Sequence, residues 1–254
     1  MTCRLVLLCL ALGAAAGLRA REAVAVAAAA NLVHAVAALN AAYRAEAPAV
    51  TVTAAVGASG SLYAQVRHGA PYDVFLSADL EYPRQLVAAG AAEASSLRTF
   101  ATGRLVVWTR RDDLDLADLA ALVRQEGVRK IALAQPKVAP YGRAAQAVLE
   151  AVGAWSEVQP KLVIGENISQ AAQFVETGSA DVGFLALSIV RSSRLPTQGH
   201  WREIPAGQHP GVTLDHGVVL TTRGKRNAAA RRYLEFLGSE AGKRVLRDFG
   251  YGVP

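Results

Sequence analysis

Cysteine is almost absent from this 254-residue chain, and its two cysteines, Cys3 and Cys9, both lie near the start. The rest of the chain therefore has no thiol for a disulfide or a thiolate metal site. Beyond the first residues, no apolar run approaches the ~20 residues of a membrane-spanning helix. The formal net charge is +6, but the lysines and arginines are scattered. We therefore interpret the basic balance as a solvated surface and expect no nucleic-acid partner.

Several site types are missing as well. The sequence has no phosphate-binding P-loop and no dinucleotide-binding glycine pattern. Its histidines show no metal-ligand spacing, so we expect no metal centre and no cofactor; they are His34, His68, His200, His209 and His216.

One enzymatic alternative stays open on residue order. The segment 57–61, Gly-Ala-Ser-Gly-Ser, resembles the G-x-S-x-G nucleophile elbow of hydrolases, although serine replaces the last glycine. Asp181 and three of the histidines follow it, as a hydrolase with Ser59 as the nucleophile would require.

The N-terminal segment has the pattern of a secretory signal peptide. Residues 1–4 form a short basic segment, residues 5–17 form an apolar run, and Leu18-Arg19-Ala20 follows. We predict a signal peptide over residues 1–20 with cleavage after Ala20. A lipoprotein signal with Cys9 as the modified residue would need a small residue before it, where the chain has Leu8.

The remaining chain alternates between strand and helix patterns. The composition, 52% hydrophobic and 19% charged, is typical of a globular protein. Helices are expected to start at Asn31, Ser59, Pro140 and Asn167, with Asn31 and Asn167 as N-caps. Further helices are expected over about 115–125, 227–237 and 240–249. Strands are expected over 22–28, 50–56, 74–76, 104–109, 130–134, 161–164, 182–187 and 217–222. The alternation predicts an α/β fold, and its restart near residue 104 indicates a second α/β layer.

The segment 50–62 shows how one of these units could bind a ligand. A β-branched strand pattern stops at Gly57, and Ser59 and Ser61 are possible helix N-caps. Such a turn leaves backbone N–H groups unpaired at the positive end of a helix, where an anion can satisfy them.

Three further turns have the same strand-to-helix character. They are Ala29-Ala30-Asn31, Pro140-Tyr141-Gly142 and Glu166-Asn167-Ile168, so that each half of the chain supplies two of the four turns. In open α/β sheets, these turns lie at the carboxyl ends of the strands, where ligands bind. If the halves face each other, the four turns can converge on one anion.

No arginine or lysine lies within the four turns, so neutral hydrogen-bond donors would bind the anion. A donor-rich site favours an oxyanion that offers only acceptors, because a protonated oxyanion would bury its own O–H against donors at about 1–3 kcal/mol. We therefore expect a fully ionised tetrahedral dianion rather than phosphate, although Glu166 could serve as the acceptor that phosphate needs.

Several motifs, taken together and in this order, resemble the periplasmic molybdate-binding proteins of ABC transporters, members of the type II periplasmic binding protein family. The motifs are AAAANL (27–32), VGASGSL (56–62), GAPYDVFLSAD (69–79), APYGRAAQAVL (139–149), GAWSEVQPKL (153–162), GENISQA (165–171) and the closing YLEFLGSEAGKRVLRDFGY (233–251).

This resemblance implies a two-lobed, Venus-flytrap α/β protein with two chain crossovers and a mostly parallel sheet in each lobe. Lobe 1 would comprise residues 21–103 and 205–254, and lobe 2 residues 104–204. The resemblance also implies a periplasmic, monomeric, non-enzymatic protein that captures molybdate or tungstate and delivers it to an inner-membrane ABC permease. The ligand-binding residues carried over from the motifs are Ala30, Asn31, Ser59, Tyr141 and, through its backbone N–H, Ile168.

Two positions differ from the family pattern. Many members have serine at Asn31, and many have a ligand tyrosine where this chain has Ala186. Tyr141 is expected to replace that tyrosine. Another oxyanion such as sulfate remains an alternative ligand. Cavity size is what separates sulfate from molybdate, and the sequence does not give that size.

Overall fold

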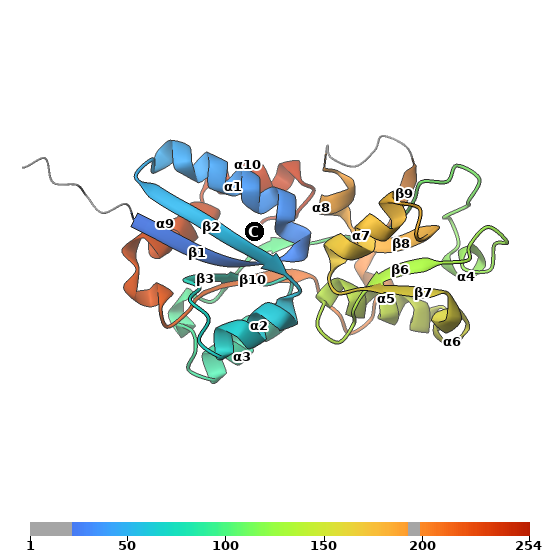
Figure 1. The fold of residues 1–254 in the computed structure, drawn as a ribbon, viewed down its shortest axis with the longest axis horizontal. Coiled ribbons are helices and arrows are strands. Elements are labelled where there is room, and N and C mark those ends of the chain that lie inside the picture. The colour runs from blue at the N-terminus through green and yellow to red at the C-terminus, as the bar shows by residue number, and fades with distance from the viewer. Residues whose placement is uncertain (1–21, 193–198) are drawn as a thin grey trace, which may run out of the picture.

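Two five-stranded sheets organise the protein in this computed structural model, which describes residues 22–192 and 199–254 (Figure 1). The signal peptide predicted for residues 1–20 lies outside the described residues. Within the described ranges, no helix is long and apolar enough to cross a membrane.

The first sheet has the strand order β2-β1-β3-β10-β4. β1, β2 and β3 pair in parallel, and β10 is antiparallel to both β3 and β4, so only β10 runs against the others. The strands are β1 (Glu22–Ala29), β2 (Val50–Gly57), β3 (Val74–Leu76), β4 (Arg98–Thr102) and β10 (Asp215–Leu220).

The second sheet repeats this arrangement with the order β7-β6-β8-β5-β9. β6, β7 and β8 run parallel, and β5 is antiparallel to β8 and β9. Each sheet is therefore mostly parallel, with the one reversed strand in its fourth position. The strands are β5 (Leu105–Thr109), β6 (Ile131–Ala134), β7 (Leu162–Gly165), β8 (Val182–Ala186) and β9 (His200–Ile204).

Helices flank both sheets (Figure 1). We call the first sheet and its helices the first lobe; the helices are α1 (Val33–Glu46), α2 (Ser59–Arg67), α3 (Glu81–Ala88), α9 (Ala228–Leu237) and α10 (Glu240–Asp248). We call the second sheet and its helices the second lobe; the helices are α4 (Leu119–Leu122), α5 (Pro140–Ala151), α6 (Trp155–Val158), α7 (Ile168–Glu176) and α8 (Leu187–Val190). Short 3-10 helices occur at η1 (Ala30–Leu32), η2 (Ala94–Ser96), η3 (Gln159–Lys161), η4 (Ala206–Gln208) and η5 (Gly224–Arg226).

Strand β1 lies between β2 and β3 and is buried on both faces over most of its length, which explains its sequence of small and β-branched residues. Val26 and Ala28 belong to the core cluster that includes residues of α1 and α9. Ala27, between them, belongs to the cluster on the opposite face, with Leu62 of α2 and Leu86 of α3. The alternation follows from the two-residue period of a strand.

The chain passes between the two lobes twice, from β4 to β5 and from β9 back to β10. The two-lobed α/β architecture with two crossovers confirms the predicted fold class. The crossovers contact each other, because the Gly103 N–H donates to the Leu214 carbonyl at 2.9 Å.

Three local predictions were wrong. Asn31 does not cap α1, which begins at Val33 after a 3-10 turn and has no side-chain cap. Ser59 does not cap α2 either; it is the first helical residue, and Ala58 occupies the cap position. The helix expected over 115–125 is the four-residue α4, capped by Asp118.

Candidate ligand-binding site

All four predicted turns meet in one small cavity between the lobes. The volume of this cavity is about 10 Å³, far below the usual 300–1,000 Å³ of small-molecule pockets. The five predicted ligand residues are among those that line it: Ala29, Ala30, Asn31, Ala58, Ser59, Ala78, Ala139, Pro140, Tyr141 and Ile168.

The topology of the sheets explains this convergence. The lining residues follow the carboxyl ends of β1, β2 and β3 in the first lobe and of β6 and β7 in the second. These strands form the parallel part of each sheet, so their connections to the next helix emerge at the same edge. The cavity lies where the two edges face each other.

The helix starts at the cavity retain backbone donors. α2 and α5 begin without a side-chain cap, and Pro140 occupies the first turn of α5. The predicted cap of α7 is confirmed: Asn167 Oδ1 accepts from the N–H groups of Ser169 and Gln170, at 3.0 and 3.1 Å. The Ile168 N–H precedes these two donors and has no partner in its own helix. These N–H groups lie at the positive ends of the helix dipoles.

Ser59 is oriented by its neighbour across the turn. Its side chain is buried, and Oγ accepts from the Ala78 N–H at 3.0 Å. Because this bond uses a lone pair of Oγ, the hydroxyl proton is still available to a ligand.

Tyr141 also offers an unused donor. The residue is 1% exposed, and its hydroxyl is buried without a hydrogen-bond partner. Burial raises the pKa of Tyr141 well above its ordinary value, so the phenol is protonated at neutral pH. A buried, unpaired hydroxyl costs about 1–3 kcal/mol, which an acceptor on a ligand would offset.

The side chain of Asn31 is bound within the protein and is not free to donate to a ligand. Its Nδ2 lies 2.6 Å from His216 Nε2 and donates to the Tyr251 hydroxyl at 2.8 Å. Both amide protons are therefore used, and Oδ1 is buried without a partner. At the cavity, Asn31 can still provide its backbone N–H, together with that of Ala30.

None of the cavity-lining residues is charged. Arg143, two residues after Tyr141, forms an ion pair with Asp79, and it also lies 3.7 Å from Glu81 Oε2. Burial raises the pKa of Asp79, and Arg143 opposes this effect. Since the arginine is already paired with acidic groups, an anion in the cavity would be bound mainly by neutral donors and helix dipoles.

Hydrogen bonds connect the lobes around the cavity. Ser169 Oγ donates to the Ala30 carbonyl and Ser188 Oγ to the Asn31 carbonyl, both at 2.9 Å. The Gly60 N–H donates to the Val138 carbonyl at 2.8 Å. The lobes are therefore closed on each other in this structure.

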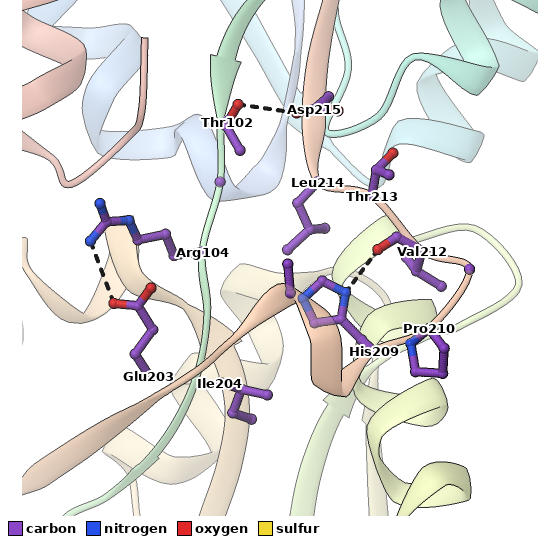
Figure 2. Close-up of a pocket in the computed structure, with 13 residues that line it drawn as sticks. Thr102, Arg104, Glu203, Ile204, His209, Pro210, Val212, Thr213, Leu214 and Asp215 are labelled. Carbon is purple, nitrogen blue, oxygen red and sulfur yellow. Dashed lines mark hydrogen bonds and ion pairs between the residues drawn. The ribbon is translucent and has the colours of Figure 1, made fainter.

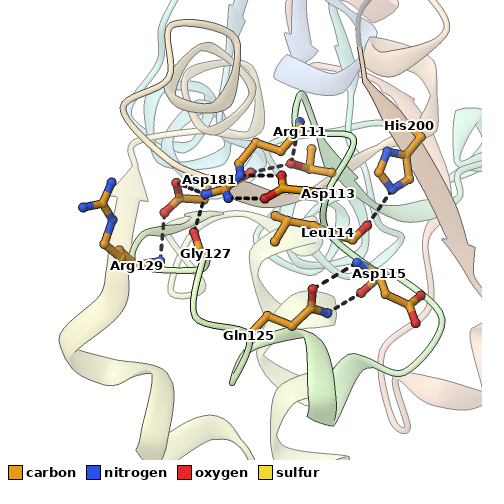
Figure 3. Close-up of polar contacts among 10 residues, drawn as sticks. Arg111, Asp113, Leu114, Asp115, Gln125, Gly127, Arg129, Asp181 and His200 are labelled. Carbon is orange, nitrogen blue, oxygen red and sulfur yellow. Dashed lines mark hydrogen bonds and ion pairs between the residues drawn. The ribbon is translucent and has the colours of Figure 1, made fainter.

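The hydrolase alternative has no support in the geometry. His200 contacts the Leu114 carbonyl, and Asp181 accepts from the N–H groups of Arg129 and Lys130 (Figure 3). His209 contacts the Val212 carbonyl at 2.8 Å (Figure 2), and His216 contacts Asn31. None of the hydrogen bonds of His200, His209 and His216 involves Ser59. Among the described residues, no group of three or more His, Cys, Asp or Glu side chains could hold a metal ion.

Comparison with known proteins places the chain in a family. The model of the bacterial extracellular solute-binding proteins, SBP_bac_11, matches residues 24–252. The chain belongs to this family. The molybdate-binding protein of Rhodobacter capsulatus is 39% identical over 201 residues, which cover 79% of this chain and 77% of that protein. The molybdate-binding protein of Azotobacter vinelandii is 36% identical over 202 residues, covering 80% and 79%.

Solved structures show the same relationship. The periplasmic molybdate-binding protein of Azotobacter vinelandii superimposes with a TM-score of 0.84 at 28% identity, covering 91% of this chain and 99% of that one. The sulfate-binding protein of Mycobacterium tuberculosis has a TM-score of 0.70 at 14% identity, covering 91% and 86%, and therefore shares the fold alone. As a member of a solute-binding family, the chain is a binding protein and not an enzyme.

Sequence reasoning missed the residues behind the cavity. Tyr251, Ser188 and His216 bind Asn31, but they lie far from it in the sequence. Ser188 belongs to the FLALS segment, in which Ala186 was noted as a departure from the family; Ala186 itself does not line the cavity. A histidine in an otherwise apolar strand was the available signal for His216.

Proposed function

We propose that this protein captures molybdate, and also tungstate, in the cavity between its lobes and delivers it to an ABC permease in the inner membrane. The ligand residues are Ala30, Asn31, Ser59, Tyr141 and Ile168. Ser59 and Tyr141 donate through their hydroxyls, and the backbone N–H groups supply the other hydrogen bonds.

One observation carries the proposal: four helix starts with available donors line a cavity without any charged residue. A fully ionised tetrahedral oxyanion presents acceptors in every direction and can use all of these donors. The helix dipoles favour its negative charge. The relatives described as molybdate-binding proteins support molybdate as the anion.

Capture requires the lobes to open and close. We assign residues 21–103 and 205–254 to one lobe and residues 104–204 to the other, with the hinge at the two crossovers. Because Ala30, Asn31 and Ser59 lie in one lobe and Tyr141 and Ile168 in the other, only the closed form binds the ligand from both sides. These additional contacts shift the population toward closure.

The predicted signal peptide over residues 1–20 and the family membership support a periplasmic location. The protein would act as a monomer without a cofactor, and nucleic acid would not be a partner. Its macromolecular partner would be the permease, which receives the closed, ligand-bound form.

Thermal unfolding of ligand-stripped protein tests the proposal, with molybdate, tungstate, sulfate and phosphate at equal concentration and ionic strength. A ligand at ~100 times its Kd adds about 2.7 kcal/mol. This corresponds to a rise in Tm of about 5–11 °C for a chain of this length. We expect the rise with molybdate and tungstate only. An equal rise with sulfate would indicate a broader oxyanion carrier, and no rise with any of the four would refute the proposal.

A further inference from the structure

His216 is not one of the residues that line the cavity; it lies behind Asn31, which does line it. Its side chain is fully buried, between Asn31 on one side and the second crossover on the other. The ring makes edge contacts with three aromatic side chains: Phe100, Tyr141 and Tyr251. Tyr141 comes from the opposite lobe, so His216 contacts residues on both sides of the cavity.

A β-bulge accompanies this placement. The pairing of β10 with β4 shifts register between His216 and Gly217, where the chain has just returned from the second lobe. Bulges redirect side chains and are frequent beside functional sites. The backbone after the bulge is also hydrogen-bonded: the Gly217 N–H donates to the Asp79 carbonyl at 3.1 Å.

The hydrogen bonds of His216 determine its tautomer. Nδ1 lies 2.8 Å from the Leu214 carbonyl, which can only accept, so Nδ1 carries the proton. Nε2 of the neutral ring is then an acceptor, and the group facing it at 2.6 Å must be the Nδ2 donor of Asn31. Burial lowers the pKa of His216 to about 4, which keeps the ring neutral at physiological pH.

The same hydrogen bonds fix the orientation of the Asn31 amide. With the amide reversed, Oδ1 would face the unprotonated Nε2, and two acceptors would oppose each other. Tyr251 completes the arrangement, because its hydroxyl accepts from Asn31 Nδ2 and donates to the Asn31 carbonyl at 2.9 Å. Asn31 is therefore held through both its side chain and its backbone.

From this geometry we propose that His216 is a positioning residue for oxyanion binding, which acts as a neutral acceptor that locks Asn31 and thereby fixes the first ligand-binding turn. This inference rests on the proposed function, because it assigns a further residue to the same site. His216 does not touch the ligand; it orients the backbone N–H groups of Ala30 and Asn31 by immobilising the side chain between them and β10.

The contact with the hinge extends this role. The Leu214 carbonyl that accepts from His216 also accepts from the Gly103 N–H, so His216 is attached to the point where the crossovers meet. A side chain at Gly103 would collide with the Tyr141 hydroxyl and with the His216 ring. The absence of a side chain at Gly103 lets Tyr141 from the second lobe approach His216.

A double-mutant cycle tests whether His216 acts through Asn31. His216→Leu removes the acceptor, and we expect about a tenfold weaker molybdate affinity, equivalent to ~1.4 kcal/mol or one hydrogen bond. His216→Gln, which can place an amide oxygen near the position of Nε2, should restore most of the affinity. In an Asn31→Ala background, His216→Leu should cause no further loss, because its target is absent.

His209 provides the matched control. It is also buried, and its Nδ1 contacts the Val212 carbonyl, but it lies in the separate pocket at the crossover (Figure 2). His209→Leu should leave the molybdate affinity unchanged. If His216→Leu does not fold, His216→Phe, which keeps a ring but also lacks the acceptor, replaces it in the same cycle and should lose affinity only when the Asn31 side chain is present.

Two results would overturn the inference. One is a folded variant in the cycle, His216→Leu or His216→Phe, with wild-type affinity, or with an equal loss in both Asn31 backgrounds. The other is an Nε2-protonated tautomer of His216 in ¹⁵N NMR spectra, which is readable whether or not an anion binds. Failure of the proposed function would be distinguished by the wild-type protein, which would then bind none of the oxyanions.

Discussion

The guanidinium of Arg143, on the first turn of α5, forms an ion pair with the carboxylate of Asp79, which precedes α3 in the opposite lobe. The Asp79 side chain is 6% exposed and that of Arg143 27%. The Arg143 Cζ also lies 5.4 Å from the centroid of the Tyr82 ring, and Nη1 donates to the Tyr82 hydroxyl at 3.3 Å. Arg143 thus connects the two lobes beside the cavity.

Arg143→Gln should speed the release of molybdate. The closed form would lose the ion pair and leave the Asp79 carboxylate nearly buried without its cation, at about 1–2 kcal/mol after allowance for the partial exposure of Arg143. Stopped-flow measurement should show dissociation about 5- to 30-fold faster. Arg124→Gln, which breaks the exposed Arg124–Glu157 pair within the second lobe, is the control. An unchanged dissociation rate in Arg143→Gln would show that the ion pair does not stabilise closure.

Ser59→Ala should weaken molybdate binding by about 1.5–3 kcal/mol, the range for a hydrogen bond to a charged group. The reason is that the Ser59 hydroxyl proton has no acceptor within the protein and is proposed to bind the anion. Calorimetric titration measures the change. Ser61→Ala, at an exposed position in the same helix, should bind like the wild type. Equal affinities for the two variants would remove Ser59 from the site.

Tyr141→Phe should weaken the binding of molybdate without lowering the stability of the ligand-free protein. Without ligand, the variant should be as stable as the wild type or more stable, because it loses an unpaired buried hydroxyl. With molybdate, it should lose about 1.5–3 kcal/mol of binding free energy. Urea unfolding with and without ligand measures both quantities. Tyr43→Phe removes another buried hydroxyl without a partner, far from the cavity, and should not affect binding.

His216 should make the stability of the protein depend on pH. Its pKa is about 4 in the folded protein and 6.5 ordinarily, so between these values the unfolded chain binds a proton that the folded protein does not. The stability therefore rises with pH through this window, and about 3 kcal/mol is lost as the pH falls from 6.5 to 4. Urea midpoints of the wild type and His216→Gln from pH 7.5 to 4.5 should diverge accordingly. Parallel pH profiles would contradict the buried neutral histidine.

Local patterns were sufficient to predict most of the fold. The predicted alternation was correct for most elements because each βα unit carries its own signals, such as Asn167, which caps α7 as expected. The edge strands β4 and β9 were not predicted. The segment 115–125 was predicted wrongly as a helix because its leucines have helical spacing. In the structure, Leu116 is buried outside any helix. The Gln125 side chain accepts from the Asp115 N–H and donates to the Asp115 carbonyl.

The candidate site was predictable in its turns but not in its supporting contacts. The turns are local features, and the parallel strands of the two sheets bring them together. Asn31 was predicted wrongly as a cap because its amide is bound by His216 and Tyr251, which lie 185 and 220 residues away in the sequence. Contacts over such distances depend on the return of the chain from the second lobe, and no short motif encodes them.

The most direct test of oxyanion binding between the lobes is an anomalous difference map from crystals grown with molybdate, recorded at the molybdenum absorption edge. We expect a single strong peak between the lobes, with the oxygens of the anion within hydrogen-bond distance of Ser59 Oγ, the Tyr141 hydroxyl and the Ile168 N–H. A peak at another place, such as the crossover pocket around His209, or no peak from a protein saturated with molybdate, would contradict it.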